Sequence, residues 1–175
     1  MSKNAKTTDF LKECMADVLL KLMDEKDFRK ITINEIAEGA NVNRSTWFRN
    51  YTAKTDALTF KLIRLWERWA DDHNLAERRY FTTDNAVSFF EFNLSIRETL
   101  KTIYNAGLQS TIYDAFYQVM TLPKEDNFLD SYKGRFYSYG LFGLLDEWVK
   151  RDFCETTEEM AEVIYRIMDF EKDLH

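Results

Sequence analysis

Hydrophobic residues recur at three- and four-residue spacings along most of the chain, which is the period of an amphipathic helix. The first such run extends from Thr8 to Asp24 and is followed by an isolated Phe28. A second apolar run begins at Lys54 and reaches about Asn74 without an internal glycine or proline. The same spacing predicts further helices at about 85–106, 108–121, 127–152 and 156–173.

Residues that end helices are rare, and some of them fall between these predicted elements. The chain has five glycines and a single proline, which leaves few of the turns that a sheet protein requires. Gly107, Pro123 and a polar loop at 82–84 separate predicted helices, and Thr156 with Glu159 forms a capping box before the last one. We therefore predict an all-α fold.

A short helix is predicted after Ile31. Thr32 can cap it, Glu35 three residues later closes a capping box, and Ile31 can pack against Ile36 as a hydrophobic staple. The helix cannot be long, because Asn41 lies in the following Gly39-Ala40-Asn41-Val42-Asn43 segment and enters the left-handed region at low cost. A tight turn is expected there.

A second short helix follows this turn, from Arg44 to Tyr51, with Asn43 as its N-cap. Trp47 and Tyr51 lie four residues apart on one face, which leaves the remaining side chains for solvent or a partner. Two short helices joined by a three- or four-residue turn form a helix-turn-helix, in which the second helix enters the DNA major groove. A plain helical hairpin has the same spacing.

The segment from Lys30 to Tyr51, followed by Lys54 and Leu58, closely resembles the DNA-binding domain of TetR-family regulators. The resemblance covers about residues 8–60, and a looser likeness to the penultimate helix of many members appears at 137–148. It implies a three-helix DNA-binding head in residues 1–52. A long fourth helix would join this head to a ligand-binding and dimerising bundle in residues 53–175.

The resemblance also implies roles for single residues. Thr32 and Thr46 would contact phosphates, as would Lys54 from the start of the fourth helix. Arg44 and Ser45 would lie near base edges, where an arginine can pair with guanine. The predicted DNA-binding set is Thr32, Asn43, Arg44, Ser45, Thr46, Phe48, Asn50 and Lys54.

The chain departs from the usual family pattern at three positions in or near the helix-turn-helix. Asn41 replaces a common turn glycine, Phe48 stands where a phosphate-binding tyrosine is frequent, and Asn50 stands where histidine is frequent. Asn50 can still donate a hydrogen bond to a phosphate. Phe48 cannot donate one and is expected only to pack against sugar.

Two apolar stripes in the C-terminal helices suit a homodimer interface, which family members form with their last two helices to match two operator half-sites. Packing inside the single chain is the alternative. The predicted interface residues are Leu129, Tyr132, Phe136, Gly140, Gly143 and Leu144 on one helix, and Met160, Val163, Ile164, Ile167 and Met168 on the other.

Aromatic residues concentrate between residues 89 and 117. A pocket lined by rings with a few phenol hydroxyls would admit a small, mostly apolar effector, although core packing explains the same pattern. The candidate ligand-binding residues are Phe89, Phe92, Tyr104, Tyr113, Phe116 and Tyr117.

The net charge of −6 is unevenly distributed. Residues 1–60 carry ten basic and nine acidic residues, so the acidity belongs to the remainder of the chain. This division is compatible with a head that approaches phosphates. The sequence has no signal-peptide core and no membrane-spanning run, which predicts a cytoplasmic protein, and Cys14 and Cys154 are expected to be buried free thiols.

Nothing in the sequence favours catalysis or a cofactor. The two histidines, His73 and His175, lie far from each other and from the cysteines, so neither a catalytic group nor a zinc site is predicted. A glycine-rich phosphate loop is also missing from the sequence. The prediction is a homodimeric, ligand-responsive repressor that binds operator DNA. The alternative is a co-regulator of the same shape that acts through a protein partner.

Overall fold

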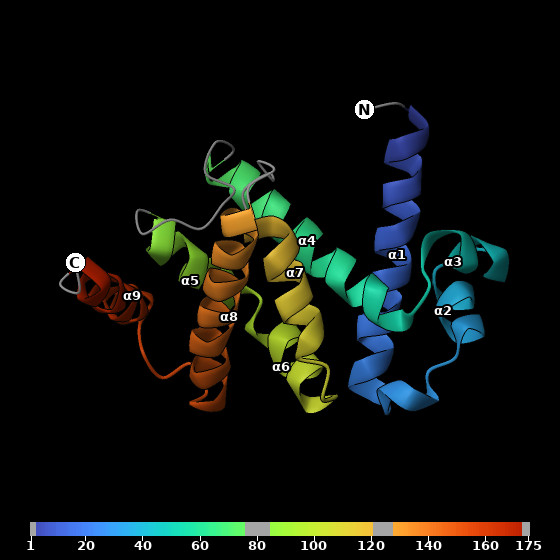
Figure 1. Ribbon diagram of the computed structural model, residues 1–175. Helices are drawn as coiled ribbons and strands as arrows, with labels where there is room; N and C mark the ends of the chain where they lie inside the picture. The colour runs from blue at the N-terminus through green and yellow to red at the C-terminus, as the bar shows by residue number, and fades with distance from the viewer. Residues whose placement is uncertain (1–2, 76–84, 121–127, 173–175) are drawn as a thin grey trace. The chain divides into compact units, whose positions relative to one another are not determined.

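The computed structural model describes residues 3–75, 85–120 and 128–172, and all regular structure in these ranges is helical (Figure 1). The all-α prediction is therefore confirmed. The helices are α1 (Lys3–Glu25), the 3-10 helix η1 (Phe28–Lys30), α2 (Ile33–Gly39), α3 (Arg44–Asn50), α4 (Lys54–Asp72), α5 (Ala86–Ser95), α6 (Arg97–Asn105), α7 (Ser110–Met120), α8 (Phe128–Lys150) and α9 (Thr157–Lys172).

Packing divides the chain into two compact units. The first consists of the described part of Met1–Leu65 together with Thr102–Ala115, and the second of the described parts of Trp66–Lys101 and Phe116–His175. Helix α4 begins in the first unit and ends in the second. The predicted functional boundary between residues 52 and 53 is a different division, and it stays a prediction.

The core of the first unit lies where α1 packs against α2 and α3. Gly39 allows a close approach of α1, because a Cβ at this position would lie 2.7 Å from Cγ1 of Val18. Thr102 from α6 donates a hydrogen bond of 2.8 Å to Asp24 of α1. The buried residues of this core are Met15, Ala16, Leu19, Ile31, Ile36, Trp47, Tyr51, Ala57 and Leu58.

Helix α2 begins and ends as the sequence predicts. The Thr32 hydroxyl accepts from the backbone N–H of Glu35, and the Glu35 carboxylate accepts from the backbone N–H of Thr32, which is the expected capping box. Ile31 and Ile36 are both buried in the core of the unit. Asn41 adopts a left-handed conformation with φ of 51°, so the predicted turn is also confirmed.

The prediction of one helix at 85–106 is wrong. Helix α5 ends at Ser95 and α6 begins at Arg97, with Ile96 between them at φ −107° and ψ 19°. The Ser95 hydroxyl donates a 2.6 Å hydrogen bond to the carbonyl of Phe92, and a serine bonded in this way competes with the helical ladder. The apolar spacing continues across this break, so the sequence pattern did not reveal it.

Aromatic side chains build the core of the second unit. Helix α5 packs against α9 and contributes Phe89, Phe90 and Phe92, all buried. Phe90 meets the ring of Trp148 edge-on at 5.4 Å between centroids. Trp148 also donates from Nε1 to the carbonyl of Glu155, 3.1 Å away, which ties the end of α8 to the turn before α9.

The remaining boundaries follow the sequence with small shifts. The capping box of Thr156 and Glu159 is present, and Gly107 takes the positive φ of 71° that favours glycine between α6 and α7. Both cysteines are free as predicted, but Cys154 is exposed and Cys14 only half-buried, so the expectation of buried thiols is wrong. Pro123 and the loop at 82–84 lie outside the described residues.

Candidate nucleic-acid interface

Helix α3 has one buried and one exposed face. Thr46 and Trp47 point into the first unit, and Trp47 is only 1% exposed. Four side chains lie in solvent. At 100° per residue their positions fall within about 140° of one another, on the side of the helix opposite Trp47. These four are Arg44, Ser45, Phe48 and Arg49.

The buried face holds α3 firmly on α1. Trp47 and Tyr51 pack with their ring centroids 5.0 Å apart, and the Tyr51 hydroxyl donates to the backbone carbonyl of Lys12 at 3.0 Å. Burial raises the pKa of the Tyr51 phenol above its usual value, so this hydroxyl stays protonated and keeps its donor role at neutral pH. The orientation of the exposed face is therefore set by packing of the opposite face.

Arg44 and Phe48 form a pair on the exposed face. The guanidinium of Arg44 lies 5.2 Å from the centroid of the Phe48 ring, one helical turn away, which is a cation–π distance. Arg49 is a second exposed cation of α3, and its Nη2 donates to the Thr46 hydroxyl at 3.2 Å. The family pattern gave Arg49 no role, and its charge and its place on α3 are the signals that point to it.

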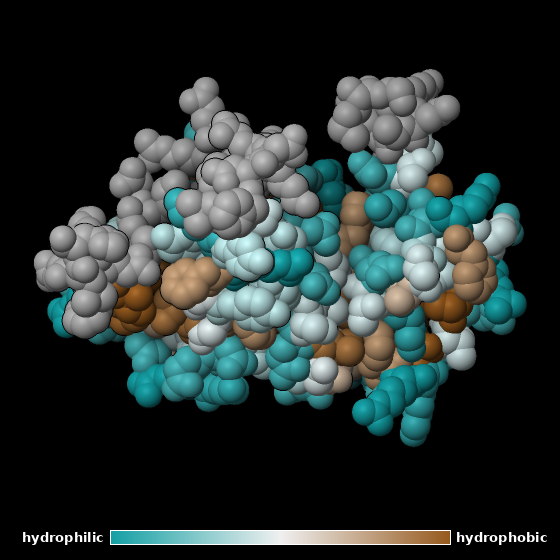
Figure 2. Space-filling model, viewed as in Figure 1, coloured by the Kyte–Doolittle hydropathy of each residue, from teal (hydrophilic) through white to brown (hydrophobic). Residues whose placement is uncertain are grey.

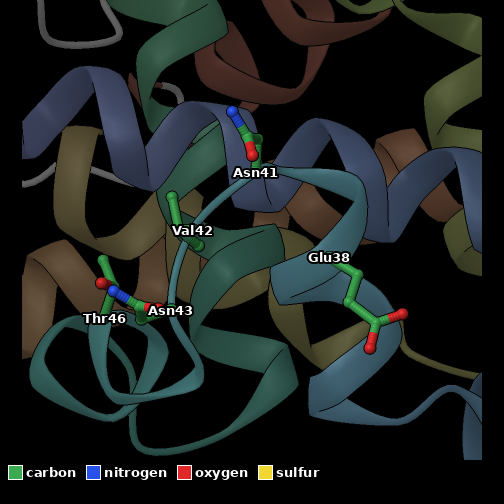
Figure 3. A pocket seen from close by; sticks show the side chains of 5 residues that line it. All are labelled: Glu38, Asn41, Val42, Asn43 and Thr46. Carbon is green, nitrogen blue, oxygen red and sulfur yellow. The ribbon is translucent and has the colours of Figure 1, made fainter.

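A hollow of about 480 Å³ lies beside the turn between α2 and α3. Its lining residues are Glu38, Asn41, Val42, Asn43 and Thr46, and Figure 3 shows Asn43 and Thr46 close together at the start of α3, with Glu38 projecting from α2. Asn43 occupies the predicted N-cap position with an extended backbone, but its side chain makes no capping hydrogen bond. Its amide is exposed beside the hollow.

The other residues expected to contact DNA are partly engaged within the chain. Thr32 is exposed, although its hydroxyl also bonds the Glu35 carboxylate at 2.9 Å. Thr46 is 7% exposed, and Asn50 donates from Nδ2 to the backbone carbonyl of Thr46 at 2.6 Å. Their phosphate contacts stay predictions.

Lys54 is also engaged within the chain. Its ammonium donates to the carbonyls of Phe28 and Ile31, the latter at 2.8 Å, and lies 4.2 Å from the centroid of the Phe28 ring. Burial lowers the pKa of this ammonium from its usual value. Lys54 thus joins the start of α4 to Phe28 of η1 and to Ile31, and its phosphate contact stays a prediction.

An ion pair links α2 to the end of α1. Lys26 at the end of α1 bonds the Glu35 carboxylate, and this bond, with those from the backbone and hydroxyl of Thr32, lowers the pKa of Glu35 to about 2. The negative charge of Glu35 is thereby neutralised by a neighbour of the same unit. Exposed cations near α2 and α3 are Arg29, Lys30, Arg44 and Arg49.

In the second unit, α8 leaves an aromatic stripe in solvent. Tyr132 is 71% exposed and Phe136 is 66% exposed, and Gly140 and Gly143 follow on the same face. The buried residues Leu141, Leu145 and Trp148 lie on the opposite side of the helix. Leu144 is half-buried at the edge of the stripe, and the side chain of Leu129 lies outside the described residues.

The predicted stripe on α9 is divided by the structure. Met160 and Ile164 are buried in the single chain and act as core residues, which corrects their assignment to a surface. Val163 and Ile167 are exposed, and Figure 2 shows apolar side chains gathered over α9 and the neighbouring part of α8. The side chain of Met168 lies outside the described residues.

The six residues predicted to line an effector pocket are divided between the two units. Phe89, Phe92, Phe116 and Tyr117 belong to the second unit, and Tyr104 and Tyr113 to the first. Phe89 and Phe116 make edge contact at 5.3 Å between centroids, and Phe92 meets Trp66 at 5.1 Å. These contacts are core packing, the alternative that the sequence left open.

Two further properties concern ligands and membranes. Within the described residues, no three His, Cys, Asp or Glu side chains gather so that they could hold a metal ion. No helix in the same ranges is both long enough and apolar enough to cross a membrane.

Comparisons with known proteins agree with this architecture. A TetR C-terminal family model, described as a transcriptional regulator C-terminal region, matches residues 89–170. The fold is similar to the crystal structure of a TetR transcriptional regulator from Rhodococcus sp. RHA1, with a TM-score of 0.51 and 15% identity over 95% of this chain and 96% of that chain. At this identity the likeness shows the fold alone. No curated protein matches the sequence.

An all-helical chain with a helix-turn-helix in its first unit and this C-terminal match is a transcriptional regulator. The C-terminal match and the fold support a TetR-family regulator, which the resemblance of residues 8–60 also indicated. That family consists of regulators and not of enzymes.

Proposed function

We propose that the protein is a sequence-specific DNA-binding regulator that acts as a homodimer, with α3 as the recognition helix of each subunit. The observation that carries the proposal is the division of α3. Trp47 is buried against α1, whereas Arg44, Ser45, Phe48 and Arg49 are exposed together. A helix held in this way can present base-reading side chains with little loss of conformational freedom on binding.

The chemistry of this face fits a duplex. Arg44 can pair with the O6 and N7 atoms of guanine, and Ser45 can bond several base edges. Asn43, whose amide makes no capping bond, and Arg49 can reach base edges or phosphates next to them. Glu35 of α2 is paired with Lys26 and repels phosphates less than a free carboxylate would, and the exposed Glu38 lies beside the hollow next to Asn43.

Dimerisation is proposed through α8 and α9. A Cβ added at Gly140 or at Gly143 would meet no atom within 4 Å, so nothing in the described part of the chain requires glycine at these two helical positions. Glycine inside a helix costs about 1 kcal/mol relative to alanine. Close approach of a second copy of α8 would account for both glycines, and Tyr132 and Phe136 beside them would be covered by the same contact.

We extend this proposal to the direction of regulation and to its control by a ligand. We propose a repressor that an effector releases from DNA, with a small, mostly apolar molecule as the effector. The aromatic core of the second unit supports an apolar ligand of this kind, because a loosened contact such as that of Phe89 with Phe116 would expose ring surface. A thermal-shift screen of aromatic metabolites, followed by DNA release, tests this part separately.

A second candidate function is a co-regulator that acts through a protein partner. Phe48 favours it, because this ring is 57% exposed and apolar at a position expected to contact a phosphate. The nearly neutral charge of residues 1–60 favours it as well. Both features weaken the electrostatic attraction to DNA and leave a surface that a protein can cover.

Fluorescence anisotropy at two salt concentrations distinguishes the two functions. The protein is titrated against labelled duplex from upstream of its own gene and against unrelated duplex. We expect tighter binding to the first, retained at moderate salt. Arg44→Ala should weaken this binding by about 1–3 kcal/mol. Arg97→Ala, which removes an exposed charge from the second unit, should not change it.

Equal binding of both duplexes, abolished by salt, would contradict sequence-specific reading. In that case the co-regulator function becomes the better explanation. Unchanged affinity and unchanged preference in Arg44→Ala would remove Arg44 from the reading face even if the protein binds DNA.

A further inference from the structure

Phe48 lacks the chemistry of its position in the DNA-binding surface. A phenyl ring has neither donor nor acceptor, so it cannot bond a phosphate or pair with the polar groups of a base. Yet it is 57% exposed on α3, directly after Trp47, which is 1% exposed. Burying the Phe48 ring would have stabilised the folded chain, so its exposure to water is energetically unfavourable.

The neighbour of Phe48 on this face is the residue expected to read guanine. The Arg44 guanidinium lies 5.2 Å from the centroid of the ring. A contact of this kind restricts the rotamers of a long side chain, which lowers the entropy lost when arginine pairs with a base. The ring therefore positions Arg44, and its remaining surface is available for a second contact.

We propose that Phe48 is a specificity-determining residue that packs against the C5 methyl group of a thymine beside the guanine read by Arg44. The inference rests on the proposed function, since it requires α3 to enter the major groove. Thymine alone among the four bases presents an apolar group there. The other three bases would place polar amino, O6 or N7 groups against the ring. The ring cannot pair with these groups, and leaving them without hydrogen bonds costs free energy.

The spacing of the two residues limits the distance between the two bases. Arg44 and Phe48 are four residues apart, which corresponds to roughly 6 Å along the helix. Successive bases on one strand are about 3.4 Å apart. The thymine should therefore lie within about two base pairs of the guanine in each half-site.

The experiment is a selection from a pool of random-sequence duplexes with the wild-type protein, Phe48→Ala and Phe48→Leu. The wild type should select a half-site with thymine within two base pairs of guanine. Phe48→Ala should lose the preference for thymine and select guanine less strongly. Phe48→Leu, which keeps an apolar side chain without a ring, should retain thymine and lose part of the guanine preference.

Removal of one methyl group from the DNA then tests the methyl contact by itself. In the selected duplex the thymine is replaced by deoxyuridine, which lacks only the C5 methyl group. We expect wild-type affinity to fall about fourfold, the effect of one apolar carbon removed from contact. The affinity of Phe48→Ala should not change, and circular dichroism should show that this variant is folded.

Three results would overturn the inference. If deoxyuridine weakens both proteins equally, or neither, Phe48 does not contact the methyl group although DNA reading stands. If Phe48→Ala selects the same motif with the same thymine preference, the ring does not read DNA, and its exposure points to a protein partner. If the wild type selects no motif, the proposed function fails and this inference fails with it.

Discussion

Helices α3 and α8 both leave large aromatic residues in solvent, but the residues beside these rings differ. On α3, the exposed ring of Phe48 lies among Arg44, Ser45 and Arg49. On α8, the exposed rings of Tyr132 and Phe136 continue into Gly140 and Gly143, and the exposed cations Lys133 and Arg135 border this stripe. The first surface suits a charged, hydrogen-bonding partner, whereas the second suits another apolar helix.

Exposure alone does not identify a binding surface. Single exposed apolar residues are common on folded proteins and need no explanation. The residues beside an exposed ring indicate its partner. Cations and hydroxyls beside a ring indicate nucleic acid, and small residues beside rings indicate close helix packing. Both surfaces also lie opposite a tightly buried face, formed by Trp47 on α3 and by Trp148 on α8.

Substitutions on the two sides of α3 should differ strongly in their effect on stability. Trp47→Ala should lower the free energy of unfolding by about 3–5 kcal/mol, because a large side chain is removed from the core. Phe48→Ala, one residue later, should change it by less than about 0.5 kcal/mol, because the ring is mostly in solvent. Urea unfolding followed by circular dichroism measures both. Similar losses in the two variants would contradict the assignment of the two faces.

The next effect tests the stripe on α8. Phe136→Arg should place a charge against its own copy across a two-fold axis and weaken self-association by about 2–4 kcal/mol. Sedimentation velocity over a range of concentrations should then show a monomer. Phe10→Arg is the matched control, because Phe10 on α1 is 65% exposed and lies outside the stripe. If both variants sediment like the wild type, the stripe does not mediate self-association.

Local sequence signals predicted the helix-turn-helix well. The capping box of Thr32 and Glu35 and the left-handed Asn41 depend on residues within a few positions of one another, so their chemistry can be read directly from the chain. The break at Ile96 was missed, because it depends on a serine bond that the apolar spacing does not reflect. Which apolar stripe residues are buried also escaped prediction.

Tertiary contacts explain the remaining differences at the site. Met160 and Ile164 share the apolar spacing of Val163 and Ile167, and only the packing of α9 on α5 separates the buried pair from the exposed pair. Asn43 has the residue type of an N-cap, and yet its side chain makes no capping bond. Residue type predicts what a side chain can do, and its neighbours determine which of those contacts it makes.

Lys54 provides a smaller effect that separates structure from DNA contact. Lys54→Met should destabilise the first unit by about 1–3 kcal/mol, because the carbonyls of Phe28 and Ile31 lose a charged donor. The salt dependence of DNA binding should not change, whereas Arg49→Ala, which removes a cation able to reach phosphates, should reduce its slope. A reduced slope in Lys54→Met, at unchanged stability, would instead support the phosphate contact expected for this residue.

The smallest effect is the pH dependence of the ion pair between Lys26 and Glu35. Because the folded state lowers the pKa of Glu35 to about 2, the unfolded state binds its proton more tightly, and the stabilisation is complete above the unfolded pKa near 4.5. It should disappear as the pH falls from about 5 towards 2. The melting temperature of the wild type should exceed that of Glu35→Gln at pH 7 by more than at pH 3.

Solvent screens this exposed pair, so the difference should be modest and should decrease with added salt. A constant difference across this range would mean that the carboxylate charge does not stabilise α2.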